Sequence, residues 1–111
     1  EFLVNLNYHQ VTTNYVDYES EAVQQFITRF RNKYGAVPLA SKHAFLGYDL
    51  GWYFLTSLMW YGDNYITCLA DHKGKGLQYN FDFSGTENGN GFQNQDVSIV
   101  KLVDYKMIKA Q

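Results

Sequence analysis

The sequence has few of the residues that build disulfides and metal sites. Its 111 residues contain one cysteine, Cys68, and one proline, Pro38. A single cysteine excludes an internal disulfide and a zinc site built on thiolates. The histidines are His9, His43 and His72, and only His72 lies close to Cys68 in sequence, which is too small a ligand set for a metal. We therefore expect no metal and no other cofactor.

The chain also lacks an excess of charge. Lys and Arg total 9 and Asp and Glu total 11, so the formal net charge is -2. The local basic group of Arg29, Arg31 and Lys33 falls at the end of an expected helix, where cations complement the helix dipole. Nucleic acid is therefore a poor candidate partner. The longest apolar stretch, 44–61, is interrupted by Asp49 and two glycines, so we expect no membrane insertion.

Recognisable catalytic motifs are missing as well. Cys68 lies in a short segment of helical character rather than at a glycine-flanked nucleophile turn. The glycines of 74–76 are too few for a phosphate-binding loop, and those of 89–91 are typical of a turn. Asp49 is the acid within an apolar stretch, and it is expected to bond a nearby backbone group or a tyrosine, or else to contact a ligand or partner. We therefore expect a protein that is not an enzyme.

Aromatic residues, in contrast, are abundant. The chain has 10 Tyr, 8 Phe and 2 Trp, with 46% hydrophobic and 18% charged residues, a composition typical of a folded chain. Two interpretations of the aromatic residues stay open. They line a sugar- or peptide-binding surface by stacking, or, more simply, they fill a core or cover a neighbouring lobe. The residues concerned are Trp52, Tyr53, Trp60, Tyr61 and Tyr65.

Periodicity predicts the first elements of the chain. Alternating apolar residues over 2–8 predict a strand with one buried face, and 11–19 has the character of a loop. Apolar residues at helical spacing then predict an amphipathic helix of about four turns. This helix begins after an N-cap at Ser20 and stops at Gly35.

A second helix, apolar nearly all round, is predicted to begin at a cap on Ser41 and to end before Gly62. Gly47 and Gly51 leave a smooth strip on this helix where another backbone is able to approach closely. A short third helix is expected over 63–69.

The end of the chain is predicted to be a hairpin. Alternation over 77–83 and again over 97–105 predicts two strands, and the glycine- and asparagine-rich segment 84–94 between them has turn chemistry. We interpret 1–111 as one partial domain of α/β type that, taken as a fragment, has α+β character. Its parts are strand and loop (1–19), helices (20–70) and hairpin (77–107).

The order of these signals resembles a known family. Lys33-Tyr34-Gly35 and Pro38 end the first helix, Gly47-Tyr48-Asp49 opens the second, and Tyr61-Gly62 ends it before the closing hairpin. This order is similar to the last third of type I periplasmic binding proteins, the class that includes the branched-chain amino-acid receptors of ABC transporters. The segments 15–18 and 76–78 resemble a bacterial subgroup in which such a domain follows peptidoglycan-binding LysM repeats.

The resemblance implies two α/β lobes joined by a hinge, with a ligand held between the lobes. It therefore implies a non-catalytic, receptor-like module located in the periplasm or otherwise outside the cytoplasm. The ligand would be a small molecule such as an amino acid, a peptide or a cell-wall fragment. Most residues that grip it would precede Glu1. Within the chain, the candidate ligand-binding residues are Tyr15, Tyr18, Tyr48 and Asp49.

Two other interpretations remain open. The chain is alternatively a self-contained α+β domain in which a cone-shaped sheet of at least four strands holds a small-molecule pocket, or a structural module of the cell envelope. In addition, one helix and three strands are too few to cover the apolar helix over 41–61. We therefore expect a two-fold homodimer, to which the edge of strand 2–8 contributes by pairing.

Overall fold

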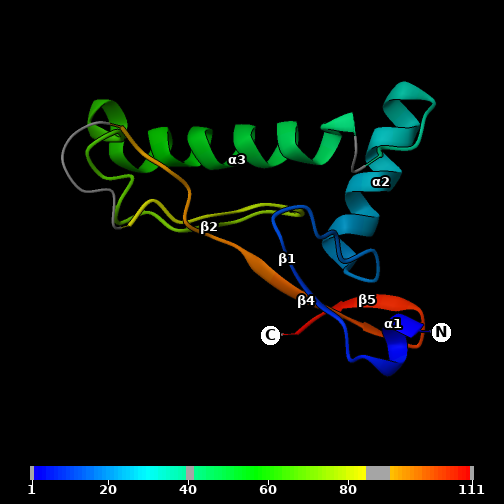
Figure 1. Cartoon of the computed structure of the whole chain (residues 1–111). Helices are drawn as coiled ribbons and strands as arrows, with labels where there is room; N and C mark the ends of the chain where they lie inside the picture. Colours follow the sequence, from blue (N-terminus) through cyan, green and yellow to red (C-terminus); the bar gives the residue numbers. More distant parts are fainter. Residues whose placement is uncertain (1, 40–41, 85–90, 111) are drawn as a thin grey trace.

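The computed structural model describes residues 2–39, 42–84 and 91–110 and shows two main helices with two small antiparallel sheets (Figure 1). The expected mixed α+β character is thereby confirmed. One sheet has the strand order β1-β4-β5, and the other contains β2 and β3. The elements in chain order are α1 (Phe2–Asn5), β1 (His9–Thr12), α2 (Glu21–Tyr34), α3 (Ala44–Tyr61), the 3-10 turn η2 (Gly62–Asn64), β2 (Gly74–Lys75), β3 (Asn80–Phe81), β4 (Ser98–Val103) and β5 (Lys106–Lys109).

Helix α2 has the bounds that its sequence predicts. Ser20 is its N-cap residue, although the Ser20 side chain makes no capping hydrogen bond. Gly35 ends the helix in a left-handed conformation (φ 66°), and its N–H donates to the Arg31 carbonyl at 2.8 Å. A residue without a Cβ adopts this conformation at little cost. The buried face of α2 is centred on Val23, which is 2% exposed.

Helix α3 ends as predicted, at Tyr61, with Gly62 following at a positive φ of 56°. The predicted cap at Ser41 lies outside the described residues, and the residue that precedes the helix is His43, in a left-handed conformation. Within the described chain no other segment packs on the glycine strip, because a Cβ added at Gly47 or Gly51 would meet no atom within 4 Å. No helix of the described residues is long and apolar enough to cross a membrane.

The predicted strand over 2–8 is wrong. Phe2–Asn5 forms the short helix α1, closed by a 3.3 Å hydrogen bond from the Leu6 N–H to the Phe2 carbonyl. Asn7 reverses the chain at φ 51°, a conformation that asparagine adopts more readily than most residues. The strand begins only afterwards, as β1, and includes Val11 and Thr12 from the expected loop. Leu3 breaks the strict alternation, so the pattern was ambiguous between strand and helix.

The predicted closing hairpin is wrong, because the segments 77–83 and 97–105 do not pair with each other. Within the segment 77–83 only β3 is a strand, and it pairs with β2. The segment 97–105 contains β4, which pairs with β1 and β5. The hairpin that closes the chain joins β4 to β5 and turns at Asp104 and Tyr105, both at positive φ (47° and 62°). This geometry normally selects Asn-Gly or Asp-Gly, so the Asp-Tyr pair gave little sequence signal.

The predicted third helix is also reduced. Only Gly62–Asn64 is helical, as a 3-10 turn, and a series of hydrogen-bonded turns follows it up to Asp71. Of the turn expected over 84–94, residues 85–90 lie outside the described residues. Gly91 has a φ of 110°, as expected of a turn glycine.

The core consists of two clusters along one side of α3. The first contains Tyr53 and Phe81, and the second contains Val23 and Phe45. The chain is extended, with a radius of gyration of 16.5 Å and dimensions of 51 × 38 × 20 Å (Figure 1). A compact domain of this length has a radius of gyration of about 13 Å. Much of the chain therefore lies at the surface.

Candidate functional site

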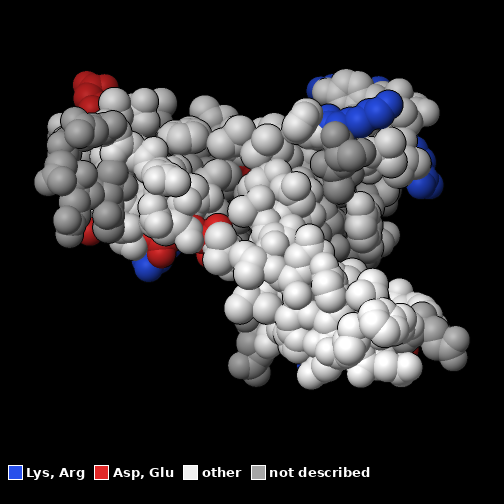
Figure 2. All heavy atoms as spheres, in the orientation of Figure 1, with Lys and Arg blue, Asp and Glu red and all other residues white. Residues whose placement is uncertain are grey.

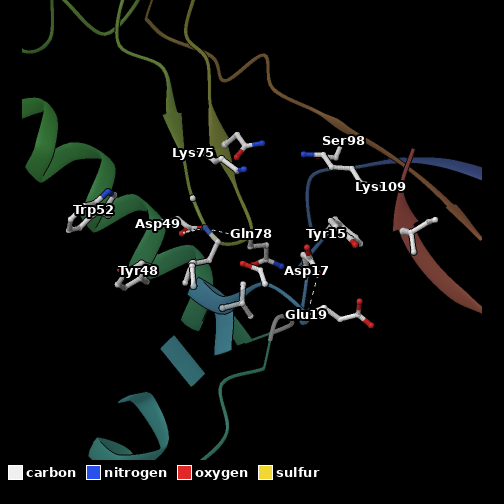
Figure 3. Close-up of a pocket in the computed structure, with 17 residues that line it drawn as sticks. Tyr15, Asp17, Glu19, Tyr48, Asp49, Trp52, Lys75, Gln78, Ser98 and Lys109 are labelled. Carbon is white, nitrogen blue, oxygen red and sulfur yellow. Dashed lines mark hydrogen bonds between the residues drawn. The ribbon is translucent and has the colours of Figure 1, made fainter. Parts of the chain in front are cut away.

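A cleft of about 690 Å³ lies between α3, the loop that precedes α2, the β2–β3 turn and the ends of β4 and β5 (Figure 3). This volume falls within the range typical of small-molecule sites. Elements that are distant in sequence meet here, so the cleft exists only in the folded chain. Its lining includes Tyr15, Asp17, Glu19, Tyr48, Asp49, Trp52, Lys75, Gln78, Asn80, Ser98 and Lys109.

Asp49 fixes the β2–β3 turn at the base of the cleft. Its side chain is buried, at 1% exposed, on the covered face of α3. The N–H of Leu77 donates to Oδ1 at 2.7 Å, and the N–H groups of Gln78 and Tyr79 donate to Oδ2 at 2.8 and 2.9 Å. A carboxylate is an acceptor for several donors, so one side chain satisfies three backbone groups of the turn. The prediction that Asp49 bonds backbone groups is confirmed.

Gly76 lets this turn approach α3. A Cβ built on Gly76 would lie 2.3 Å from the Tyr79 carbonyl oxygen and 2.4 Å from the Asp49 Cγ, far inside van der Waals contact. The Gly76 N–H donates to that same carbonyl at 2.9 Å. Glycine is therefore required here by space rather than by backbone dihedral angles.

The loop before α2 is tied to the turn through Asn14. The Gln78 side-chain amide donates to the Asn14 carbonyl at 3.2 Å, and the Tyr79 hydroxyl donates to the Asn14 side-chain oxygen. The Gln78 Oε1 atom is buried without a hydrogen-bond partner among the described residues. These contacts hold Tyr15, the next residue, at the side of the cleft.

One wall of the cleft carries negative charge. The Asp17 carboxylate accepts a hydrogen bond from the Glu19 N–H at 3.0 Å, which shapes the loop. Burial raises the pKa of the Tyr15 hydroxyl above its usual value, and the nearby charges of Asp17 and Glu19 raise it further, whereas a hydrogen bond with the Lys109 backbone acts in the opposite direction. Tyr15 therefore remains a neutral phenol at physiological pH.

The rest of the cleft offers positive charge and aromatic surface. Lys75 and Lys109 extend from different elements toward the same opening (Figure 3). Among the described residues, neither ammonium group is paired with a carboxylate. The rings of Tyr48 and Trp52 stack with centroids 6.5 Å apart and an interplanar angle of 8°, which gives one border of the cleft a flat apolar surface.

The structure brings together three of the four predicted site residues. Tyr15, Tyr48 and Asp49 all line the cleft, whereas Tyr18 points elsewhere and makes an edge contact with Phe45, at 6.3 Å between centroids. The sequence interpretation missed Lys75, Gln78 and Lys109 as lining residues. Gln78 belongs to the segment 76–78, on which the family resemblance partly depends. No local signal in the sequence indicates that Lys109 lies near the other residues of the cleft.

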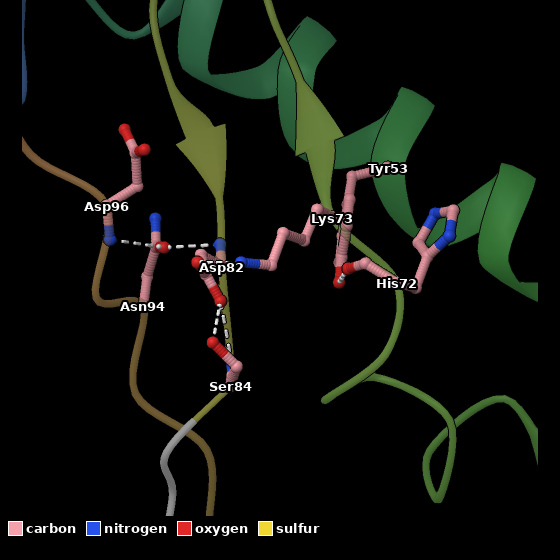
Figure 4. Close-up of polar contacts among 7 residues, drawn as sticks. All are labelled: Tyr53, His72, Lys73, Asp82, Ser84, Asn94 and Asp96. Carbon is pink, nitrogen blue, oxygen red and sulfur yellow. Dashed lines mark hydrogen bonds and ion pairs between the residues drawn. The ribbon is translucent and has the colours of Figure 1, made fainter.

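A second polar group stabilises the far end of the β2–β3 sheet (Figure 4). Lys73 pairs with Asp82 at 2.8 Å, and the Ser84 N–H and hydroxyl also donate to that carboxylate. The hydrogen bond from Lys73, followed by those from Ser84, lowers the pKa of Asp82 from 3.8 to about 2. The Asp82 N–H in turn donates to the Asn94 side chain at 2.9 Å. The polar side chains of this cluster therefore bond to one another and to the local backbone.

Tyr53 joins this region to α3. Its hydroxyl donates to the His72 carbonyl at 2.7 Å, and burial raises its pKa. Its ring stacks on Phe81 at 4.6 Å, and a Cβ on Gly74 would lie 2.4 Å from it. The described residues contain no group of three or more His, Cys, Asp or Glu side chains able to hold a metal ion.

Comparison with protein families, with curated proteins and with solved structures finds no match for the chain. The functional interpretation therefore depends on the cleft itself and on the resemblance described above.

Proposed function

We propose that the chain is a non-catalytic, receptor-like ligand-binding module, the C-terminal part of a two-lobe, extracytoplasmic solute-binding protein. The observation that carries the proposal is the cleft, which gathers Tyr15, Tyr48 and Asp49 from separate elements. In this proposal the cleft is one wall of a ligand site, and the facing wall belongs to a second lobe. The extended shape supports this arrangement, because a single lobe that packs on another leaves surface uncovered.

The lining of the cleft indicates the kind of ligand. The acidic group of Asp17, the ammonium groups of Lys75 and Lys109, and the apolar surface beside Trp52 suit a small molecule that carries both charges on an apolar body. Glu19 adds negative charge at the same wall but is paired with Lys106 at 3.4 Å. An amino acid, a short peptide and a cell-wall fragment all have this character. Because one wall cannot enclose a ligand and expel its water, we expect millimolar rather than micromolar affinity from the 111 residues alone.

Nuclear magnetic resonance of the ¹⁵N-labelled chain tests the proposal. Titration with free amino acids, a dipeptide and a muramyl dipeptide should give saturable shifts for the backbone amides of 77–79. Tyr48→Ala should weaken the response, whereas Tyr105→Ala should leave it unchanged, because Tyr105 is exposed in the β4–β5 turn. The absence of saturable shifts with every probe, or an equal effect of both variants, would contradict the proposal.

The alternative of a self-contained domain with a cone-shaped sheet is less well supported. That fold needs at least four strands in one sheet, and the larger sheet among the described residues has three. A structural role in the cell envelope remains compatible with the same cleft. Binding of the chain to purified peptidoglycan, without saturable binding of any small probe, would favour it.

A further inference from the structure

Most of the circumference of α3 is uncovered in the described chain. The buried side chains recur every four residues and form one stripe: Phe45, Asp49, Tyr53 and Ser57. The opposite side, at the same helical spacing, is exposed and apolar. We call it the open face of α3, and its residues are Gly47, Leu50, Gly51, Phe54, Leu55, Leu58 and Met59, with Tyr48 and Trp52 at its margin next to the cleft.

The open face carries no charge. The charged residue of α3 is Asp49, which is buried and accepts three hydrogen bonds. Figure 2 shows a largely uncharged surface along α3, between an acidic group at one end of the molecule and basic residues over α2. Two such faces meet without repulsion and without stranding a charge in an apolar contact.

The exposed area is large enough for a stable contact. Met59 is 81% exposed and Leu55 is 62% exposed, and the other large side chains of the open face and its margin range from 37% to 60%. Taking roughly 200 Å² for each fully exposed large side chain, they leave about 700 Å² uncovered on one copy. Complete coverage of this area on both copies would bury at most about 1,400 Å², an upper bound that lies within the range of about 1,200–2,000 Å² for specific interfaces.

Gly47 and Gly51 lie near the middle of the open face. A Cβ at either position meets nothing within its own chain, so neither glycine is needed for packing in the monomer. Each costs helix stability relative to alanine. Their absent side chains leave a shallow strip between Leu50 and Leu55, into which a second helix fits closely.

We infer that the open face of α3 is the surface through which two copies of the chain associate, α3 against α3 across a two-fold axis. The same patch on both copies makes a closed contact, which a self-complementary apolar face satisfies directly. This inference does not depend on the proposed ligand-binding function.

Light scattering after size exclusion tests the inference with a matched pair of variants. The unaltered chain should elute at twice 12.9 kDa. Leu55→Glu should be monomeric, because it places an unpaired charge in the contact. Ile66→Glu should remain a dimer, because Ile66 is 52% exposed but lies outside α3. A monomeric unaltered chain at high micromolar concentration, or equal effects of the two variants, would overturn the inference.

Gly51→Ala separates the interface from folding. In the monomer the added methyl group meets no atom, so the variant should melt at a slightly higher temperature at concentrations where the chain is monomeric. In the dimer the same methyl group separates the helices, so the dissociation constant should rise by about tenfold. A Gly51→Ala variant that dimerises as tightly as the unaltered chain would show that the helices do not meet at this strip and would overturn the proposed geometry.

Discussion

Replacing Asp49 by asparagine tests the central contact of the cleft. The asparagine oxygen still accepts from the turn, but the atom that replaces the other carboxylate oxygen becomes an NH₂ group. Depending on how the amide is oriented, that group faces either the N–H of Leu77 or the N–H groups of Gln78 and Tyr79. In the unaltered chain these three N–H groups donate to the carboxylate at 2.7, 2.8 and 2.9 Å. Hydrogen bonds to a charged group contribute about 1.5–3 kcal/mol each, and a stranded buried donor costs about 1–3 kcal/mol.

The amide should take the orientation that keeps the bonds from Gln78 and Tyr79 and loses only the bond from Leu77. Because the cleft admits water to part of the turn, we expect the lower end of both values, and hence a decrease of about 2–3 kcal/mol in the free energy of unfolding. Urea denaturation followed by tryptophan fluorescence measures it. Asp71→Asn is the control, since it removes the same charge at an exposed position. Amide hydrogen exchange should also become faster at 77–79 in the Asp49 variant. A loss similar to that of the control, with unchanged exchange at 77–79, would refute the structural role of this carboxylate.

Three further predictions follow from the same geometry. Gly76→Ala should destabilise the fold by about 1–3 kcal/mol, because its Cβ would collide with the Tyr79 carbonyl and with Asp49; an unchanged melting temperature would show that the turn does not approach α3 this closely. The pKa of Asp82 is lowered from 3.8 to about 2, so the stability that its carboxylate contributes is present above pH 3.8 and is lost as the pH falls through about 2. Over this pH interval the melting temperature of Asp82→Asn should fall less steeply than that of the unaltered chain. Parallel curves for the two proteins would contradict the pairing of Asp82 with Lys73. Calorimetric titration of the 111-residue chain with free amino acids should give no micromolar dissociation constant, because one wall of a cleft leaves the ligand hydrated, and one such constant would show that the chain encloses a ligand by itself.

The two main helices were predictable because their signals are local. The apolar spacing of α2 and the stop residues Gly35 and Gly62 act within a few residues of each other, and the structure retains all of them. The structural role of Asp49 was predictable in kind, since a carboxylate in an apolar helix needs donors. Its actual donors lie at 77–79, and nothing in the sequence indicates that separation.

The strand pairing was not predictable either, because it also depends on contacts between residues that are far apart in the sequence. Alternation reveals that a segment is extended but not which partner it pairs with. The Asp104-Tyr105 turn lacks glycine, so no residue indicated a hairpin between β4 and β5. The sequence pattern therefore paired the segment of β4 with the segment 77–83 instead. Only three of the four predicted site residues line the cleft, because Tyr18 packs against Phe45 instead. The direction of the Tyr18 side chain depends on this packing, which the sequence pattern does not indicate.

The two core clusters meet along α3 and at the turn beneath it, where Leu77 packs against one cluster and Tyr79 against the other. We expect each cluster to open separately, so that the chain would have two units of local unfolding that share one helix and one turn. Whatever immobilises the segment 77–79 suppresses the opening of both units at once. A molecule bound in the cleft would therefore slow hydrogen exchange as far away as Phe26 and Phe83, which belong to the two clusters but do not line the cleft.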